Sequence, residues 1–464
     1  MSEPQASKMW SGRFREPLDP AFEAWQRSFP FDWRLLPEEV AASKAHARAI
    51  AAAGILNEAE LAATLQGLDS VLTNNALQQQ SLLAEAPEAE DIHHFVELQL
   101  TRLIGPLALK LHTGRSRNEQ IATDMRLFVR GAIDTTLEGL RHWRSALLDL
   151  ATTAGEAVMP SYTHLQRAEP VLVAHWLLAY VSMIDRDISR LHDARKRMNL
   201  CPLGSGAVAG ATLALDRSIA ANALAFDAPT PNSMDATSDR DFALEFTQAV
   251  ATLGIHISRF AEELTLYSTA EFGFLDLPER FSTGSSAMPQ KKNPDFTELI
   301  RGKSGRLLGA ATTLATLIKG LPLAYNKDLQ EGQEPVFDAA DTIAGILRVL
   351  PDFTRSLRFR FDVMERAAAN GYLNAMAAAT YLTHKGIPFR KAHEKIGNAV
   401  RFALETQREL NDLTLAELKT FGEEFEADFF ASITLEATLD CHDVAGGTAR
   451  QRVAHALALA RTAE

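Results

Sequence analysis

Apolar residues recur along this chain at the spacing of one helix face. The spacing alternates between four and three residues in the series Phe246, Val250, Leu253, Ile257, Phe260, Leu264 and Tyr267. Such a series places its side chains on a single stripe of a helix. Further helices are predicted over residues 118–153, 171–198, 294–319 and 337–350. No stretch alternates polar and apolar residues as clearly, so the sequence predicts a mostly α protein built around a bundle of long helices.

The helix predicted over residues 171–198 is apolar nearly all round in its first half, from Leu172 to Ile184. A helix that is apolar on every side must be enclosed by neighbours. Another copy of the chain can supply part of that cover, because long bundles often oligomerise. These stripes indicate a core and carry no information about chemistry.

Composition narrows the function classes. The chain has 464 residues, of which 46% are hydrophobic and 23% charged, and its formal net charge is -12. The apolar fraction is ordinary for a globular protein and excludes wholesale disorder. The acidic balance argues against a general binder of nucleic acid or of membrane surfaces. The two cysteines, Cys201 and Cys441, suffice for neither a disulfide scaffold nor a cysteine metal cluster.

The sequence shows no targeting signal. Its first residues, MSEPQASK, are polar and lack the apolar core of a signal peptide. The longest apolar stretch, residues 171–184, is shorter than the roughly 18 residues of a membrane span. We therefore expect a cytoplasmic protein that binds neither membrane nor nucleic acid.

The segment from Thr283 to Pro294 concentrates polar chemistry. Gly284 precedes two serines, two lysines follow, and the segment ends in Asn293-Pro294. Asn as N-cap and Pro as first helical residue predict a helix start there. A loop with hydroxyl and ammonium groups at a helix N-terminus suits a carboxylate or phosphate. Taken alone, such a loop is more often an ordinary connection with solvated lysines.

Four other short segments are candidates. His164 lies among hydroxyl and amide side chains just before the apolar helix, and Arg115 and Arg117 flank a turn where they could clamp an anion. For each segment, a structural histidine or a solvated charge is the alternative interpretation. The segments are Ser161–Arg167, Gly114–Asn118, Tyr325–Gln330 and Asp91–His93.

Two patterns are discounted. Gly204, Gly206 and Gly210 resemble a phosphate-binding loop, but no strand is predicted before them. His93-His94 has no accompanying ligand set at a metal spacing. The sequence therefore predicts neither a nucleotide site nor a metal site.

The run GSSAMPQKKNP resembles the signature of the fumarase/aspartase superfamily of lyases. Other segments resemble the argininosuccinate lyase family within it, from about Trp10 to the C-terminal tail: MWSGRF, RSFPFD, GRSRN, SYTHLQRAEPV, TSDRDF, LIRGK, LPLAYNKDLQE and GGTA. The resemblance implies an N-terminal helical domain (1–113), a central long-helix domain (114–365) and a C-terminal helical domain (366–464). It also implies a homotetramer in which each active site combines segments of three subunits.

The implied reaction is a cofactor-free β-elimination of argininosuccinate to arginine and fumarate through a carbanion. By resemblance, Ser285 is the base, His164 the acid or an acid relay, Glu298 the group that polarises His164, and Lys291 a stabiliser of negative charge. The implied substrate contacts are Ser28, His93, Arg115, Asn118, Thr163, Asn293, Tyr325, Gln330 and Gln333.

One position departs from the family pattern. After YNKDLQE the family usually continues Asp-Lys-Glu, whereas this chain has Gly332-Gln333-Glu334. Because Gln333 brings no charge, we expect weaker substrate binding unless another cation such as Lys327 compensates. Two alternatives stay open: a superfamily lyase acting on a related succinyl adduct such as adenylosuccinate, and a non-catalytic, crystallin-like structural paralogue. The sequence does not distinguish arginine biosynthesis from nitrogen disposal in a urea cycle.

Overall fold

The computed structural model of the chain describes residues 16–75, 82–84 and 86–462. The family segment MWSGRF lies outside the described residues. The chain separates into two compact units. The first contains residues up to 131 together with 195–244 and 313–337, and the second contains residues 132–194, 245–312 and those from 338 onwards.

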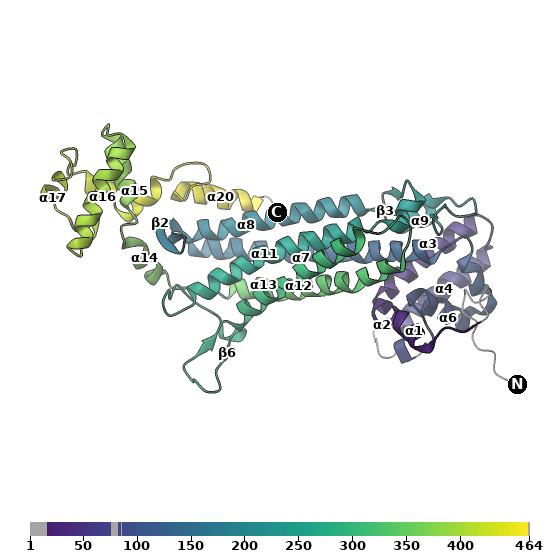
Figure 1. The fold of residues 1–464 in the computed structure, drawn as a ribbon. Coiled ribbons are helices and arrows are strands. Elements are labelled where there is room, and N and C mark those ends of the chain that lie inside the picture. The colour runs from purple at the N-terminus through teal and green to yellow at the C-terminus, as the bar shows by residue number, and fades with distance from the viewer. Residues whose placement is uncertain (1–15, 76–81, 85, 463–464) are drawn as a thin grey trace. The chain divides into compact units, whose positions relative to one another are not determined.

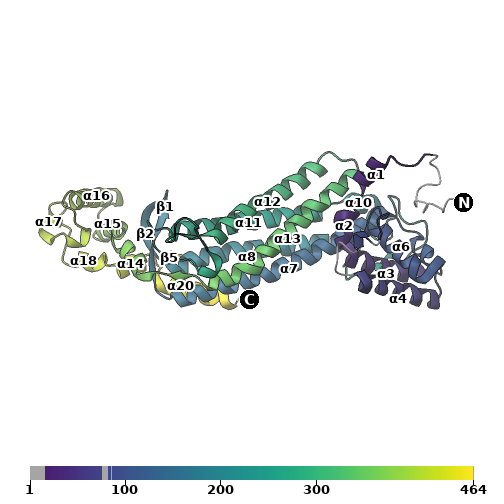
Figure 2. The ribbon, with the colours of Figure 1, turned by 90° about the horizontal axis from the view of Figure 1, so that it is seen from below.

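Five long helices dominate the chain, and each was predicted from the sequence. In the second unit they lie side by side in both views (Figure 1, Figure 2). Each of the five also contributes residues to the first unit. They are α7 (Arg117–Ala154), α8 (Val173–Met198), α11 (Asp241–Tyr267), α12 (Asp295–Ile318) and α13 (Gln333–Arg355). The mostly α fold predicted from the apolar stripes is therefore confirmed.

The core of the second unit follows from the predicted stripe on α11. Trp143 of α7 is fully buried, and its ring meets Phe260 of α11 edge-on with centroids 5.6 Å apart. Trp143 Nε1 donates a hydrogen bond to Thr354 Oγ1 of α13 at 3.2 Å. This one indole thus joins three of the long helices, and its polar atom is satisfied inside the core.

Two of these helices approach each other closely at Gly139 of α7. A Cβ atom at that position would lie 2.8 Å from Cβ of Leu347 on α13. Real Cβ atoms do not come so close, so any larger residue at 139 would push the helices apart. Glycine is required here by packing rather than by backbone conformation.

The apolar half of α8 is enclosed on its inner face by the same chain. Val173, Leu177 and Ile184 are fully buried. Trp176 Nε1 and Tyr180 Oη both donate to Glu263 Oε2 of α11, at 2.6 and 2.5 Å. The enclosure predicted for this helix is present, and cover from a second copy remains a prediction.

The first unit contains shorter helices beside its share of the long ones. A run of helices fills its N-terminal part: α1 (Pro20–Gln26), α2 (Phe29–Asp32), η2 (Trp33–Leu35), α3 (Leu36–Ala52), α4 (Glu58–Asn75), α6 (Ile92–Ile104) and η3 (Gly105–His112). The later elements of this unit are β3 (Leu200–Cys201), α9 (Arg217–Ala223), β4 (Ala228–Pro229), α10 (Ser233–Ser238) and η5 (Lys327–Gly332).

The glycine-rich loop of the first unit wraps an arginine. A short strand, β3, does precede the loop and pairs in parallel with β4, so the prediction that none would was wrong. The Arg217 guanidinium donates to the carbonyl oxygens of Leu203 and Thr230 at 2.9 and 2.8 Å. A Cβ at Gly204 would lie 2.6 Å from Arg217 Cγ. The loop therefore encloses a side chain of its own chain, which agrees with discounting it as a nucleotide site.

The rest of the second unit consists of short strand pairs and small helices. The antiparallel pairs are β1 (Val158–Thr163) with β2 (Gln166–Leu172), β5 (Leu275–Asp276) with β8 (Arg358–Phe359), and β6 (Thr283–Gly284) with β7 (Lys292–Asn293). The helices are η4 (Glu279–Phe281), α14 (Phe361–Ala369), α15 (Ala375–His384), α16 (Phe389–Glu405), η6 (Leu410–Asp412), α17 (Leu415–Lys419), α18 (Phe429–Ser432), α19 (Leu435–Asp440) and α20 (Arg450–Thr462).

The C-terminal helices have an apolar core of their own, in which Leu382, Ile396, Phe425 and Phe429 are buried together. This cluster is compatible with a separate C-terminal domain, but the three domain boundaries remain a prediction. Among the described residues, no helix is both long and apolar enough to cross a membrane.

Candidate active site

A pocket of about 140 Å³ in the first unit collects side chains from distant parts of the sequence. Six of its residues were predicted as substrate contacts: Ser28, His93, Asn118, Tyr325, Gln330 and Gln333. They come from the start of α2, from α6 and α7, and from the segment that leads through η5 into α13. The pocket is completed by Asp32, Glu90, Asp91, Arg117, Ile121 and Lys327.

The start of α6 forms one wall of this pocket. Asp91 is the N-cap, and its side chain accepts a hydrogen bond from the His94 N–H at 2.7 Å. Asp32 accepts from the Ile92 N–H at 3.0 Å. Burial and the nearby Asp91 raise the pKa of Asp32 to about 7. Two carboxyl groups thus satisfy N–H groups that the helix leaves unpaired at its N-terminus.

Two cationic side chains of the pocket, those of Arg117 and Lys327, lie close to its acidic side chains. Arg117 Nη1 lies 3.0 Å from Asp91 Oδ2 and 3.5 Å from Glu90 Oε2. Lys327 Nζ lies 3.8 Å from Glu90 Oε1, and the lysine side chain is half exposed. The pocket therefore offers both charged signs and suits a substrate that carries carboxylates together with a cationic group.

Gln333 stands where the resemblance leads us to expect lysine. Its side chain is almost fully buried, and its Oε1 atom is sealed from solvent with no hydrogen-bond partner among the described residues. Gln330 is nearby in sequence and donates through Nε2 to the Gln26 carbonyl at 3.1 Å. An unsatisfied buried oxygen is costly, so a ligand with a donor group at this position would gain a partner.

Tyr325 lines the same pocket and is half buried. Burial raises the pKa of its hydroxyl, while the nearby Arg240 guanidinium opposes that rise. Arg240 belongs to the TSDRDF segment and is buried, with Nη1 donating to the Asp239 carbonyl at 2.7 Å. The phenol is therefore neutral at physiological pH and available as a hydrogen-bond donor.

His93 is held from behind by carboxyl groups that sequence reasoning missed. Its Nδ1 atom lies 2.7 Å from Glu39 Oε2 and 3.6 Å from Asp124 Oδ2. These three side chains are buried, and one ligand-type atom of each lies within 4.8 Å of the others. They come from α3, α6 and α7, so no local spacing shows them. The available signal is an acidic residue among the mostly apolar residues that form the buried face of a helix, as Glu39 does on α3.

Arg115 lies outside this pocket. Its Nη1 donates to Ser43 Oγ at 2.8 Å and lies 3.9 Å from Glu39 Oε1. Arg115 lines a neighbouring cavity of about 660 Å³ with the glycine-rich loop. Its predicted contact with substrate therefore stays a prediction, whereas its contact with Glu39 is direct.

His164 occupies the tip of the β1–β2 hairpin in the second unit. The sequence did not predict these strands. His164 and Leu165 have φ angles of 55° and 58°, in the left-handed region that side chains other than glycine rarely adopt. Both residues and Thr163 are exposed. Strained backbone of this kind often marks a functional position.

Ser285 and Lys291 lie in the loop between β6 and β7, also in the second unit. Ser285 Oγ accepts hydrogen bonds from the Ala287 and Met288 N–H groups at 3.3 and 3.1 Å. Two backbone donors on one hydroxyl oxygen favour negative charge there. Lys291 is exposed, and so is Glu298 in the first turn of α12.

Asn293 does not cap α12, contrary to prediction. Its Nδ2 atom donates to Thr283 Oγ1 at 3.4 Å and to the Gly284 carbonyl at 3.5 Å. The β6–β7 pairing aligns Asn293 with Thr283, which directs the side chain across the hairpin, and the helix begins at Asp295. Asn293 therefore braces the loop that carries Ser285.

The second unit does not join its predicted catalytic groups by hydrogen bonds. In the part of the chain that the structure describes, His164 is not hydrogen-bonded to Glu298, nor Ser285 to Lys291. Their roles, and the substrate contacts expected of Thr163 and Asn293, stay predictions that depend on assembly.

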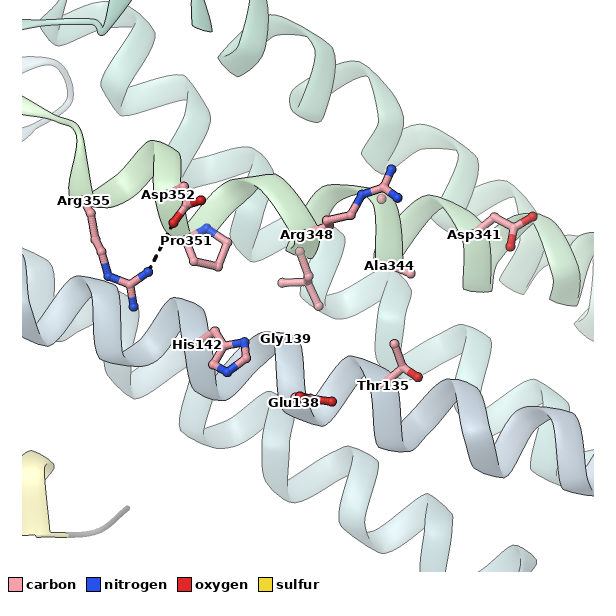
Figure 3. A pocket seen from close by; sticks show the side chains of 12 residues that line it. Thr135, Glu138, Gly139, His142, Asp341, Ala344, Arg348, Pro351, Asp352 and Arg355 are labelled. Carbon is pink, nitrogen blue, oxygen red and sulfur yellow. Dashed lines mark hydrogen bonds and ion pairs between the residues drawn. The ribbon is translucent and has the colours of Figure 1, made fainter. Parts of the chain in front are cut away.

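A larger groove, of about 930 Å³, lies between α7 and α13 (Figure 3). It contains none of the predicted site residues. Its charged side chains include an ion pair in which Arg355 Nη1 lies 3.5 Å from Asp352 Oδ1. Volume alone therefore does not identify the active site.

Comparisons with known proteins identify the family of the chain. Residues 12–309 match the family model described as Lyase, and residues 372–440 match the one described as Argininosuccinate lyase C-terminal. An argininosuccinate lyase of Acidobacterium capsulatum is 64% identical over 96% of this chain and 92% of its own length. That of Koribacter versatilis is 57% identical over 98% of this chain and 97% of its own. A solved structure of an EDDS lyase variant with bound fumarate is similar with a TM-score of 0.81 and 25% identity, covering 93% of this chain and 86% of that one.

Proposed function

This chain belongs to the argininosuccinate lyase family and is a carbon–nitrogen lyase, and we propose how its residues cleave argininosuccinate into arginine and fumarate. The observation that carries the proposal is the pocket of the first unit. It gathers six predicted substrate contacts from four separate stretches of sequence and combines acids with cations. Such a mixed lining fits a substrate with three carboxylates, an ammonium group and a guanidinium.

The elimination begins with loss of a proton from the carbon beside a carboxylate, which is a very weak acid. Removing it places additional negative charge on that carboxylate, and donors already aimed at its oxygens lower the barrier. In our proposal Ser285 takes the proton. The backbone donors to its Oγ and the Lys291 ammonium stabilise the alkoxide that this role requires.

The departing guanidino nitrogen needs a proton from the other face of the substrate. We assign this step to His164, with Glu298 polarising the imidazole. The exposed hairpin tip makes His164 available to a neighbouring subunit, because no described side chain of its own subunit holds it. Thr163 and Asn293 would then contact the substrate from the same two hairpins.

This scheme requires a homotetramer in which three subunits build each active site. The proposal is supported by the exposure of His164, Lys291 and Glu298, which a single chain leaves in solvent. Size-exclusion chromatography with light scattering is expected to give four chains. A fully active monomer would contradict the shared site. We also propose that the enzyme acts in the cytoplasm in arginine biosynthesis.

The decisive test is release of fumarate from argininosuccinate, followed by ultraviolet absorbance. We expect turnover by the parent enzyme and its near-complete loss in Ser285→Ala. The matched control is Ser286→Ala, which removes the adjacent, exposed hydroxyl and should retain activity. Equal loss in both variants, or turnover of adenylosuccinate in preference, would overturn the assignment. A parent enzyme without turnover would instead indicate a structural paralogue.

A further inference from the structure

Behind the pocket lies a buried cluster of titratable groups that the mechanism above does not use. Glu39 of α3 and Asp124 of α7 are fully buried, and both lie close to the Nδ1 atom of His93 on α6. Glu39 Oε2 lies 2.7 Å from His93 Nδ1. His93 also lines the pocket, so the pocket and the cluster share this one ring.

Glu39 has the partners of an ionised carboxylate. Ser43 Oγ donates to its Oε1 at 2.6 Å, Gln120 Nε2 donates to the same atom at 3.1 Å, and Arg115 Nη1 lies 3.9 Å away. Burial alone would raise the pKa of Glu39, but His93 and Arg115 lower it to about 2. A buried carboxylate with two cations and two neutral donors is stable as an anion.

Asp124 has the opposite surroundings. Both of its carboxyl oxygens are sealed from solvent, and no described group donates a hydrogen bond to either. Burial and the neighbouring Glu39 charge raise the pKa of Asp124 well above its usual range. Two buried carboxyl groups this close cannot both be ionised cheaply, so one of them retains a proton.

We infer that Glu39 is a positioning residue which holds His93 as an imidazolium facing the substrate pocket, and that Asp124 stays protonated beside it. With Nδ1 donating to Glu39, the Nε2–H is the ring atom left for a ligand, and it carries positive charge. This inference rests on the proposed function, because it makes His93 the cation that receives a substrate carboxylate. The positive charge of His93 replaces in part the charge that Gln333 lacks.

The groups around His93 on each neighbouring element agree with this charge state. Asp32 of α2 and Asp91 at the N-cap of α6 both favour the protonated ring. Burial opposes protonation most strongly, but Glu39, Asp91 and Asp32 together outweigh it and raise the pKa of His93 overall. The Arg115 guanidinium contacts Glu39, with Nη1 3.9 Å from Oε1.

A divalent cation is a weaker explanation of the same cluster. His93 Nδ1 and Glu39 Oε2 already satisfy each other at hydrogen-bond distance. A metal ion between them would have to break that contact, and it would lie close to the Arg115 guanidinium. With Asp124 protonated, the charges of the cluster balance without a metal ion.

The test is the protonation state of His93, measured by NMR on the full-length enzyme labelled with ¹³C at histidine Cε1. A His93→Gln variant assigns the signal. His46 is the internal reference, because burial lowers its pKa to about 3 and keeps it neutral. We expect an imidazolium signal for His93 at neutral pH, next to a neutral signal for His46. A neutral His93 in the parent enzyme would overturn the inference, whatever the variants do.

Two substitutions separate the roles of the carboxyl groups. Glu39→Gln should lower the His93 pKa and raise KM for argininosuccinate about tenfold with kcat changed far less, since a charged hydrogen bond becomes a neutral one. Asp124→Asn, which mimics a protonated carboxyl, should leave both the His93 signal and KM nearly unchanged. An equal shift of the His93 signal in the two variants would show that Asp124 is ionised, and it would contradict the inference.

The NMR result does not depend on turnover. An imidazolium His93 in an enzyme that releases no fumarate would refute the proposed function and leave the charge state of His93 established. A metal site would be identified if added Zn²⁺ displaced the His93 proton in the parent but did not do so in Glu39→Gln. That result would overturn the inference.

Discussion

Thr283 and Asp295 close the loop that carries Ser285 and Lys291. The Thr283 N–H donates to Asp295 Oδ2 at 2.6 Å, which joins the first residue of β6 to the first residue of α12. The loop is therefore anchored at its base by a charge-assisted hydrogen bond, while its tip stays exposed.

Replacing this anchor should affect catalysis more than folding. Asp295→Ala removes the acceptor from a half-buried position at the first residue of α12, so we expect kcat to fall roughly tenfold through misplacement of the loop, with Tm nearly unchanged. Fumarate release and a thermal melt measure the two effects. Asp276→Ala, at an exposed position of β5, is the control and should change neither. A large drop in Tm with normal kcat would show that Asp295 serves stability instead.

The backbone at Leu165 provides a second prediction. Its φ of 58° is costly for leucine and free for glycine, and the side chain is 70% exposed in the single chain. Leu165→Gly should raise the free energy of unfolding by about 0.5–1 kcal/mol, the relief of strain less the extra chain entropy of glycine. Urea denaturation checks this value. Gln166→Gly, one residue into β2, should instead destabilise by about 1 kcal/mol. Destabilisation by both would mean that assembly buries Leu165.

Asp32 should make stability depend on pH near neutrality. Because burial and Asp91 raise its pKa from 3.8 to about 7, the folded chain retains a proton that the unfolded chain has lost between these values. Stability therefore falls as the pH rises through this window and is lowest above pH 7. Asp32→Asn, which cannot ionise, should match the parent at pH 4 and exceed it at pH 8 by at most about 4 kcal/mol. Parallel stability curves for the two proteins would contradict the raised pKa.

Gln333 and Lys327 can be tested as a pair. Gln333→Lys places an ammonium group among Asp32, Glu90 and Asp91, and we expect KM for argininosuccinate to fall several-fold, since charged hydrogen bonds are worth about 1.5–3 kcal/mol. Lys327→Gln alone should raise KM. If the two cations substitute for each other, Lys327→Gln should raise KM by a smaller factor in the Gln333→Lys background than in the parent. Equal factors in the two backgrounds would show that Lys327 does not compensate for Gln333.

Sequence periodicity was sufficient for the long helices because their buried faces are long and regular. The stripe from Phe246 to Tyr267 lies within one helix, α11, and its buried face is the predicted one. The β1–β2 hairpin escaped prediction because its tip, His164-Leu165, lacks the Asn-Gly or Gly-Gly pair that usually supports positive φ. The prediction that Asn293 caps α12 failed for a related reason. The pairing of β6 with β7, a non-local interaction, directs the Asn293 side chain across the hairpin and not towards the helix.

The candidate site was predictable where short motifs carry it. Ser28, Asn118, Tyr325 and Gln330 belong to the family segments, and the structure brings them into one pocket. Glu39 and Asp124 belong to no such segment. Their proximity to His93 arises only when α3, α6 and α7 pack together, and this is a property of the fold rather than of any local pattern.

The close approach of α7 and α13 at Gly139 also constrains how this chain can change over time. Because Leu347 occupies the space that any side chain at 139 would need, the two positions are free to vary only together. Descendants with alanine or serine at 139 are expected to carry glycine at 347, because the clash is with the Cβ atom of residue 347, and lineages that keep leucine at 347 should keep glycine at 139. The close packing of α7 and α13 thus predicts covariation between two positions that are more than two hundred residues apart in the sequence.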